Sequence, residues 1–209
     1  AKPMKHDEWI AHIKTLGGER KYVEPAKGTV NPRVFIDRLA KKMPANVTVV
    51  ADVGQNQIWT CTEYKFRKEG RLLTSGGMGT MGYSVPAAIG AKMADNSRAT
   101  VAICGDGAFQ MSFMELATAV QFGVDIKVVV MTNNRLGMVR ELQTNGYHDR
   151  QTAVFLDGSP DFIKLAEAYG IPAMRVYDDD TMEKGVEMLA EHKGICLVEV
   201  VVDKDMPTL

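Results

Sequence analysis

The stretch CGDGAFQMSFMELATAVQFGVDIKVVVMTNN, residues 104 to 134, decides the fold of this chain. It places Asp106 between two glycines just after the apolar run ATVAIC, and Asn133 directly after a second apolar run, IKVVVMT. The segment between the two runs has the apolar spacing of a helix, with Phe113, Leu116, Ala117 and Val120 on one face. Two buried strands joined by a helical crossover are typical of neighbouring parallel strands.

The same alternation continues on both sides of this unit. A helix is expected from Asn31-Pro32, because proline is tolerated in a first helical turn. We expect further strands at residues 47–54, 71–77, 173–177 and 195–202, and further helices at residues 55–64, 83–95, 160–170 and 180–192. The pattern predicts an α/β fold, doubly wound, with an about six-stranded, mainly parallel sheet and helices on both faces.

Residues 1–25 have a different character from the rest. They contain one short helix signal, formed by Trp9, Ile10, Ile13 and Leu16, and are otherwise charged. We interpret 1–25 as a linker from an upstream domain and 26–209 as the folded domain.

Composition excludes several classes of function. The net charge of −1 and the absence of long single-sign runs give no indication of a nucleic-acid or membrane partner. The three cysteines are far apart and unpaired in sequence, so we expect buried free thiols in a reducing, cytoplasmic setting; they are Cys61, Cys104 and Cys196. The four histidines show no metal-ligand spacing.

A glycine run offers one alternative function. GMGTMG, with Gly77, Gly79 and Gly82, matches the dinucleotide fingerprint G-x-G-x-x-G, and Asp106 follows 24 residues after its last glycine. A nicotinamide site is therefore one interpretation. A tight strand–helix contact that requires glycines is the other.

The positions of Asp106 and Asn133 predict a metal site. Parallel strands deliver both residues to the same edge of the sheet, where ligands bind in open α/β folds. Carboxylate and amide oxygens suit Mg²⁺, which completes its shell with water and phosphate oxygens. Gly105 and Gly107 allow close backbone approach, so the amides of Gly107 and Ala108 are expected to face an anion. The alternative is structural, with Asp106 capping a helix and Asn133 forming a turn.

Four ordered motifs carry a family resemblance over residues 5 to 203: DVGQNQIW, TSGGMGTMGYSVPAAIGA, GDGAFQMSFMELATA and NNRLGMVRELQ. With them the chain resembles the C-terminal, thiamine diphosphate-binding domain of acetolactate synthase large subunits. The resemblance implies thiamine diphosphate and Mg²⁺ as cofactors, and FAD on a different domain. It also implies an activity that decarboxylates pyruvate and condenses the two-carbon unit with a second 2-oxo acid.

The resemblance assigns roles to individual residues. Mg²⁺ would be held by Asp106, the side chain of Asn133 and the main-chain carbonyl of Arg135, with Asn134 a weaker candidate than Asn133. Catalytic roles fall to Gly79, whose carbonyl would meet the 4′-amino group of the cofactor, and to Met81, the wedge that bends it; a plain core methionine is the alternative for Met81. The other cofactor-binding positions are Val53, Gly54, Gln55, Asn56, Gly105, Gly107, Ala108, Gly137, Met138 and Val139.

Two departures from the family limit this assignment. Leu142 stands where the family commonly has tryptophan, and Asn56 where it usually has histidine, which leaves the acceptor and one diphosphate contact open. The family's catalytic glutamate belongs to an N-terminal domain of a dimeric or tetrameric enzyme, sometimes with a small regulatory subunit, so we expect the isolated 209 residues to be inactive. A different thiamine-dependent 2-oxo acid decarboxylase, oxidase or carboligase, and a non-catalytic binding domain, remain alternatives.

Overall fold

The centre of the protein is one six-stranded sheet. A computed structural model describes residues 6–16, 22–67 and 69–208. The strand order is β2-β1-β3-β4-β6-β5 and every neighbouring pair is parallel, so the predicted class is confirmed. The strands are β1 (Thr48–Ala51), β2 (Arg71–Thr74), β3 (Thr100–Gly105), β4 (Lys127–Thr132), β5 (Ala173–Val176) and β6 (Cys196–Val201).

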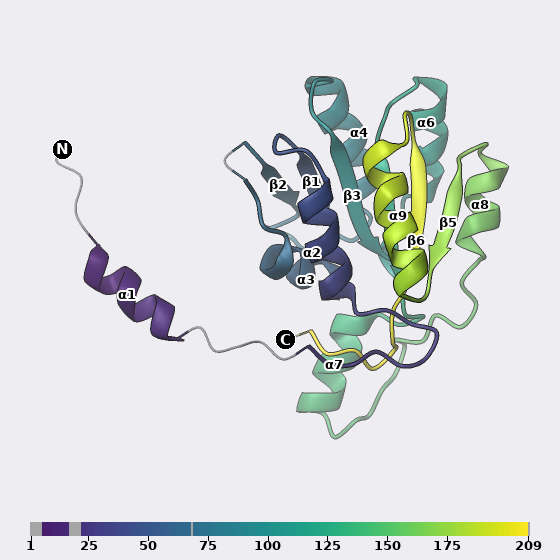
Figure 1. The fold of residues 1–209 in the computed structure, drawn as a ribbon. Helices are drawn as coiled ribbons and strands as arrows, with labels where there is room; N and C mark the ends of the chain where they lie inside the picture. The colour runs from purple at the N-terminus through teal and green to yellow at the C-terminus, as the bar shows by residue number, and fades with distance from the viewer. Residues whose placement is uncertain (1–5, 17–21, 68, 209) are drawn as a thin grey trace.

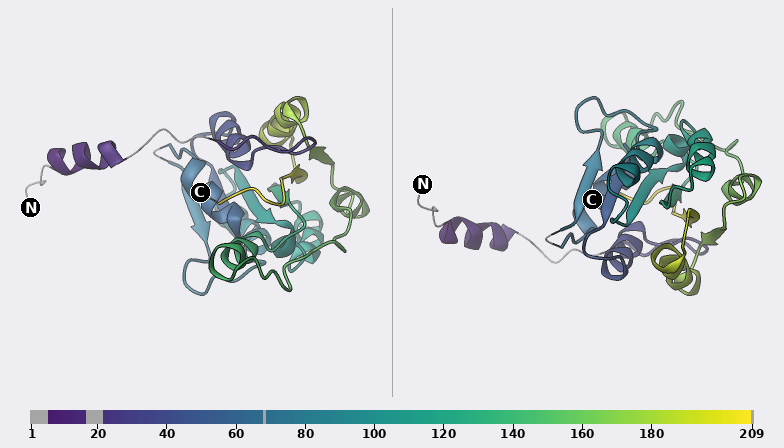
Figure 2. Two further views of the ribbon diagram at one scale, coloured as in Figure 1. Left: turned by 90° about the horizontal axis from the view of Figure 1, so that it is seen from below. Right: turned by 90° about the horizontal axis from the view of Figure 1, so that it is seen from above.

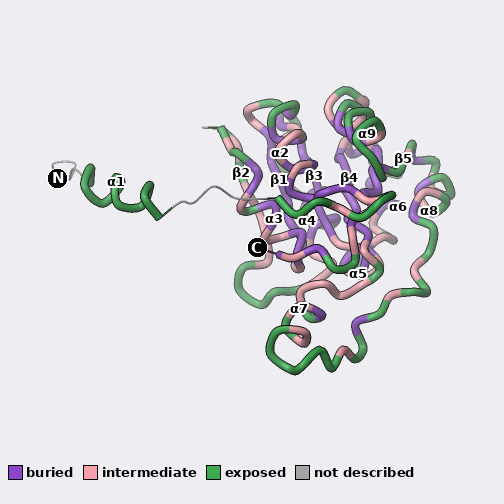
Figure 3. The backbone as a smooth tube through the Cα atoms, turned by 60° about the horizontal axis from the view of Figure 1, so that its bottom comes forward, coloured by how far each residue is buried: buried purple, intermediate pink, exposed green. Residues whose placement is uncertain are grey.

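Helices cover both faces of the sheet (Figures 1 and 2). One face packs against α2 (Pro32–Lys42), α3 (Gln55–Glu63) and α9 (Asp179–Glu191). The other packs against α4 (Ser84–Ala94), α6 (Leu116–Gln121) and α8 (Phe162–Ala168). Successive strand residues alternate between the two layers, so that Val49 and Val50 belong to opposite cores. The central strands β1, β3, β4 and β6 are therefore almost fully buried, whereas the edge strands β2 and β5 are partly exposed (Figure 3).

Side-chain caps fix where several helices begin. Asn31 accepts hydrogen bonds from the backbone of Arg33 and Val34, and Pro32 opens α2 as predicted. Asp161 caps α8, and Asp178 forms a capping box at α9.

The segment after β3 differs from the single helix expected there. It forms a short α5 (Asp106–Phe109), a 3-10 turn η1 (Phe113–Glu115) and then α6. This break rotates the buried face, so that Leu116 and Ala119 are buried while Ala117 and Val120 are exposed. The predicted buried face was thus wrong at Ala117 and Val120.

Helix α7 (Gly137–Gly146) was not expected from the sequence. It lies beyond the carboxyl ends of the strands, below the sheet in Figure 1. Its apolar residues Met138, Val139 and Leu142 recur at helical spacing but are not buried, and Arg140 is its one buried residue among those described.

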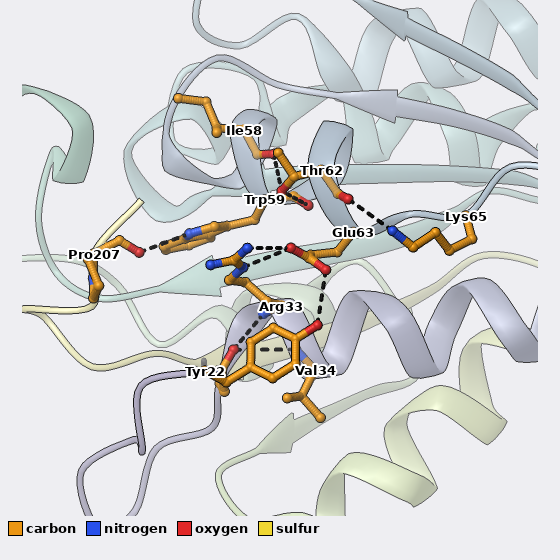
Figure 4. A network of polar contacts seen from close by, with 10 residues as sticks. Tyr22, Arg33, Val34, Ile58, Trp59, Thr62, Glu63, Lys65 and Pro207 are labelled. Atoms are coloured by element: carbon orange, nitrogen blue, oxygen red, sulfur yellow. Dashed lines mark hydrogen bonds and ion pairs between the residues drawn. The ribbon is translucent and has the colours of Figure 1, made fainter. Parts of the chain in front are cut away.

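The N-terminal helix signal is confirmed as α1 (Asp7–Leu16), which has no buried residue. Residues 1–5 and 17–21 of the predicted linker lie outside the described residues, and the boundary at residue 25 stays a prediction. Tyr22 already contacts the domain: its hydroxyl donates to Glu63, which also accepts two bonds from Arg33 (Figure 4).

Two further expectations concern the thiols and the membrane. Cys104 and Cys196 are buried, but Cys61 is exposed on α3, so the prediction of three buried thiols was wrong there. Within the described part of the chain, no helix has the length and apolar character needed to cross a membrane.

Candidate functional site

The candidate site is built on the adjacent ends of β3 and β4. Asp106 follows β3 and Asn133 follows β4, and the two strands are paired in register from Val101–Lys127 to Gly105–Met131. The backbone N–H of Asn133 donates to Asp106 Oδ2 at 3.2 Å, across 27 residues of sequence. The predicted proximity of these two residues is therefore present in the structure.

Asp106 is a buried carboxylate held only by neutral groups. Its side chain is reached by three backbone N–H groups: Gly107 on Oδ1 at 2.8 Å, and Asn133 and Asn134 on Oδ2 at 3.2 and 2.6 Å. These bonds favour the charged form, but burial outweighs them and raises the pKa of Asp106 to about 6. No ion pair to Asp106 occurs among the described residues. The site thus contains negative charge that lacks a counter-ion.

The hydrogen bonds of this turn differ from one expectation. The Gly107 N–H, expected to face an anion, donates instead to the side chain of Asp106. The structural alternative for Asp106 and Asn133 is also partly present, because Asn133 Oδ1 accepts from the backbone N–H of Arg135 at 3.0 Å. Both residues shape local turns and still border the same cleft.

Gln55 links the Asn133 side chain to the C-terminal segment. Asn133 Nδ2 donates to Gln55 Oε1 at 3.2 Å. Gln55 Nε2 in turn donates to the Met206 carbonyl at 3.0 Å and to Thr208 Oγ1 at 3.1 Å. The polar atoms of Gln55 are therefore engaged within the protein, and its side chain orients Asn133.

Asn56 is held differently from its neighbour. Its Nδ2 donates to the carbonyls of Asp52 and Ile103 at 2.9 and 3.1 Å. Asn56 is buried and ties the start of α3 to the ends of β1 and β3. The Asn56 side chain therefore stabilises the turn through contacts within the protein.

A cleft with an internal volume of about 100 Å³ opens at these strand ends. Of the predicted site residues, all but Gly79 line it. The lining residues that were predicted are Val53, Gly54, Gln55, Asn56, Met81, Gly105, Asp106, Gly107, Ala108, Asn133, Arg135, Gly137, Met138 and Val139. The structure adds four that were not predicted: Trp59, Met131, Leu136 and Val202.

Two glycines, Gly107 and Gly137, allow neighbouring side chains to pack closely against the backbone of this cleft. A Cβ at Gly107 would lie 2.7 Å from Leu136 Cδ2 and 3.4 Å from Met81 Cε, and one at Gly137 would collide with the Gln55 amide. Met81 therefore reaches over the Asp106 turn. Gly79 has a positive φ of 62° and sits on the exposed loop that carries Met81, away from the lining.

The family model for the thiamine pyrophosphate enzyme, C-terminal TPP binding domain, matches residues 52–200. The chain belongs to this family. The matched range contains every lining residue of the cleft except Val202. The dinucleotide interpretation of the glycine run is not favoured, because Gly77 and Gly79 lie outside the lining and the oxygens of Asp106 accept backbone N–H groups.

Individual relatives of this TPP-binding domain are named acetolactate synthases. The chain is 38% identical over 95% of its length to the acetolactate synthase large subunit of Lactococcus lactis. It is 37% identical over 99% to the mitochondrial acetolactate synthase catalytic subunit of Saccharomyces cerevisiae, and 39% identical over 91% to the probable large subunit of Methanocaldococcus jannaschii. It spans about a third of the length of each relative: 34%, 31% and 32%.

The donors at the cleft fit a hard divalent cation with phosphate. One buried, uncompensated carboxylate and one amide oxygen are a suitable protein contribution for Mg²⁺, which takes its other ligands from water and phosphate. Among the described residues there is no cluster of three or more histidine, cysteine, aspartate or glutamate side chains that could hold a metal without such a ligand. The TPP-binding domain therefore suits a metal that arrives with a diphosphate.

Proposed function

We propose that this TPP-binding domain serves an acetolactate synthase that decarboxylates pyruvate and condenses the two-carbon unit with a second 2-oxo acid. The observation that carries the proposal is the buried Asp106 carboxylate, without a counter-ion, beside Asn133 at the mouth of the cleft. The names of the relatives, which match over nearly the whole chain, support this activity over others of the family.

The metal would be held by the Asp106 carboxylate, the Asn133 side-chain oxygen and the Arg135 carbonyl. Burial disfavours the ionised form of Asp106, and a cation beside the carboxylate would offset this cost because an opposite charge favours the ionised form. Gln55 accepts from the amide nitrogen of Asn133, and the amide oxygen accepts from the Arg135 N–H with one lone pair left for a metal. Mg²⁺ would thus complete an arrangement that the chain has largely built.

The diphosphate would lie against the turn of Val53, Gly54, Gln55 and Asn56 and against the Gly105–Ala108 turn. Thiamine diphosphate, when bound, supplies a carbon nucleophile and an electron sink for decarboxylation of 2-oxo acids. The chain's own contribution is to position the cofactor and to exclude water. Water would be excluded by the apolar side chains that line the cleft, which are Val53, Met81, Met131, Leu136, Met138, Val139 and Val202.

Met81 and Gly79 differ in how their positions suit the proposed roles, because Met81 lines the cleft and Gly79 does not. Met81 lines the cleft above the Asp106 turn, which suits a wedge beneath the cofactor. Gly79 would have to present its carbonyl from the exposed loop. We place the substrate end at Gly137, Met138 and Val139, the first residues of α7.

Calorimetry tests the cofactor assignment. The naturally expressed protein that contains this chain should bind thiamine diphosphate in the presence of Mg²⁺ and should not bind NAD. An Asp106→Asn variant should lose more than about 100-fold in affinity, beyond the 10–100-fold typical of outer-shell metal partners. Asp161→Asn, at the cap of α8, is the matched control. Undiminished affinity of Asp106→Asn would contradict the metal assignment.

A second candidate is a sister enzyme with the same cofactor. Leu142, with 62% of its surface exposed on α7, replaces the tryptophan that the resemblance leads us to expect. Product analysis with pyruvate distinguishes the candidates, since acetolactate, acetyl phosphate and acetaldehyde identify a synthase, an oxidase and a decarboxylase. Leu142→Trp should raise the preference for 2-oxobutyrate over pyruvate as acceptor in a synthase.

The proposal extends to partners outside the chain. We propose a homodimer or homotetramer, with the catalytic glutamate and any FAD on other parts of the polypeptide, a small regulatory subunit, and a cytoplasmic location. The Lactococcus lactis relative is named a large subunit and the Saccharomyces cerevisiae relative is named mitochondrial, and these names describe those proteins. Size measurement with and without thiamine diphosphate, together with cell fractionation, tests these points, and the isolated 209-residue chain should show no turnover.

A further inference from the structure

A second buried carboxylate lies behind the cleft, at the end of β1. Asp52 is fully buried, lies outside the cleft lining, and begins the motif DVGQNQIW, in which it was assigned no role. Its Oδ1 accepts hydrogen bonds from the backbone of Val53 at 2.8 Å and of Gly82 at 3.0 Å, and its Oδ2 accepts from Ser84 at 2.7 Å. One side chain thus joins two segments that are 30 residues apart.

Asp52 reaches the loop that carries Gly79 and Met81. Residues 76–80 of this loop are exposed, and two of its hydrogen bonds are internal, from Gly79 and Thr80 to Ser75. The bonds of Gly82 and Ser84 to Asp52 attach the end of this loop to the sheet. They fix the backbone immediately after Met81, at a glycine with φ of 82°.

Asp52 also belongs to the turn proposed to hold the diphosphate. Its carboxylate accepts from Val53, and its main-chain carbonyl accepts from the side chain of Asn56. Met81 meanwhile extends to 3.4 Å from where a Cβ of Gly107 would stand. Asp52 therefore connects the Met81 side of the cleft to the diphosphate side.

We propose that Asp52 is a positioning residue that sets the loop of Gly79 and Met81 against the turns that receive the diphosphate. This inference rests on the proposed function, since it assigns Asp52 to the geometry of a thiamine diphosphate site. Aspartate suits the position because both of its side-chain oxygens are acceptors and together receive all three N–H groups. Asparagine of the same shape would turn an N–H₂ group toward at least one of these donors.

The experiment compares two ligands on the naturally expressed protein. Thiamine diphosphate with Mg²⁺ contacts both sides of the cleft, whereas inorganic pyrophosphate with Mg²⁺ probes the diphosphate side alone. We expect Asp52→Asn to raise the dissociation constant of thiamine diphosphate at least fivefold and that of pyrophosphate less than twofold. In the Met81→Ala background, Asp52→Asn should add less than twofold, because both changes act on the same contact.

A core variant separates positioning from general destabilisation. Val186→Ala opens a cavity between α9 and the sheet, remote from the cleft, and should lower the melting temperature without altering the ratio of the two dissociation constants. If Asp52→Asn does not fold, Gly82→Ala replaces it. An alanine Cβ at Gly82 would lie 3.0 Å from Met111 Cβ at a positive φ, which displaces the same loop while Asp52 is kept.

The outcomes are distinct. A wild-type protein that binds neither ligand contradicts the proposed function. A wild-type protein that binds both, with an Asp52→Asn variant that weakens them equally or not at all, contradicts the positioning role alone. Selective weakening of thiamine diphosphate, absent in Val186→Ala, supports it.

Discussion

Gln55 accepts a hydrogen bond from the side-chain amide of Asn133 at 3.2 Å, although 78 residues separate the two. The orientation of an amide determines which of its atoms can face a metal. Because Asn133 Nδ2 points to Gln55, a cation could meet only its Oδ1, which accepts one hydrogen bond from the Arg135 N–H and keeps a second lone pair. Gln55 is itself fixed by Glu141, Met206 and Thr208, so the C-terminal segment helps to orient a proposed metal ligand.

Removal of the Gln55 amide should therefore weaken metal binding without breaking the fold. For Gln55→Ala, we expect the affinity for Mg²⁺, titrated at saturating thiamine diphosphate, to fall about tenfold, the lower end of the range for outer-shell partners. Gln57→Ala, on the same helix, removes a bond to Thr74 instead and should leave Mg²⁺ binding unchanged. Equal effects of the two variants would show that Gln55 has no orienting role.

The metal-free protein should lose stability as pH rises through the titration of Asp106. Burial raises the folded-state pKa of Asp106 from 3.8 to about 6, so the folded state binds this proton more tightly than the unfolded state. The stabilisation is present below pH 3.8 and is lost as pH approaches 6, with a magnitude of about 3 kcal/mol. The free energy of unfolding in EDTA, compared between wild type and Asp106→Asn, should show this difference between pH 4 and pH 7.

Exposed carboxylates act in the opposite direction but cancel in that comparison. The side-chain hydroxyl of Thr181 lowers the pKa of Asp178, for example, so its contribution is lost as pH falls. This residue is present in both proteins. A difference between wild type and variant that stays constant with pH would contradict the raised pKa of Asp106.

The ion pair between Arg33 of α2 and Glu63 of α3 should contribute strongly to the stability of the domain. Arg33 donates to Glu63 Oε1 at 2.8 and 2.6 Å, and both residues are buried (Figure 4). Glu63→Ala should lower the free energy of unfolding by about 3–5 kcal/mol, because it leaves the Arg33 charge buried without its partner. Tyr22→Phe, which removes one bond to Glu63, should cost about 1 kcal/mol. Denaturant titrations of both variants provide the test, and a cost for Glu63→Ala below that of Tyr22→Phe would contradict it.

The three thiols should differ in reactivity. Burial raises the pKa of Cys196 to about 11 and that of Cys104 well above its usual range, while Cys61 is exposed. We expect a maleimide reagent to label Cys61 alone in the folded protein and all three thiols after unfolding. Mass spectrometry of labelled peptides checks this, and rapid labelling of Cys104 would indicate that the β3 core opens.

The sequence was sufficient for the strands and for most of the cleft. Apolar runs bounded by glycine or asparagine marked β3 and β4, and parallel pairing then brought Asp106 and Asn133 together. Helix α7 was not expected because it is not a core helix: Val139 and Leu142 are exposed, and Arg140 is its one buried residue among those described. The inward face of α6 was misplaced because a 3-10 turn precedes it.

The contacts that orient the site residues could not be predicted from sequence patterns, for a different reason. Gln55 meets Met206 and Thr208 across 151 and 153 residues, and Asp52 meets Gly82 across 30. No local periodicity encodes such pairings. Polar side chains at strand ends signal a site, but their partners emerge only when the sheet is assembled.

The strand order has a consequence for synthesis on the ribosome. β6 lies between β4 and β5, so β5 is translated before the neighbour on which its sheet pairing depends. The other four strands need no later segment to pair with one another, and they include both strand tips that present Asp106 and Asn133. The strand ends that present Asp106 and Asn133 therefore belong to strands whose mutual pairing needs no later segment, whereas β5 can pair only after β6 has been synthesised.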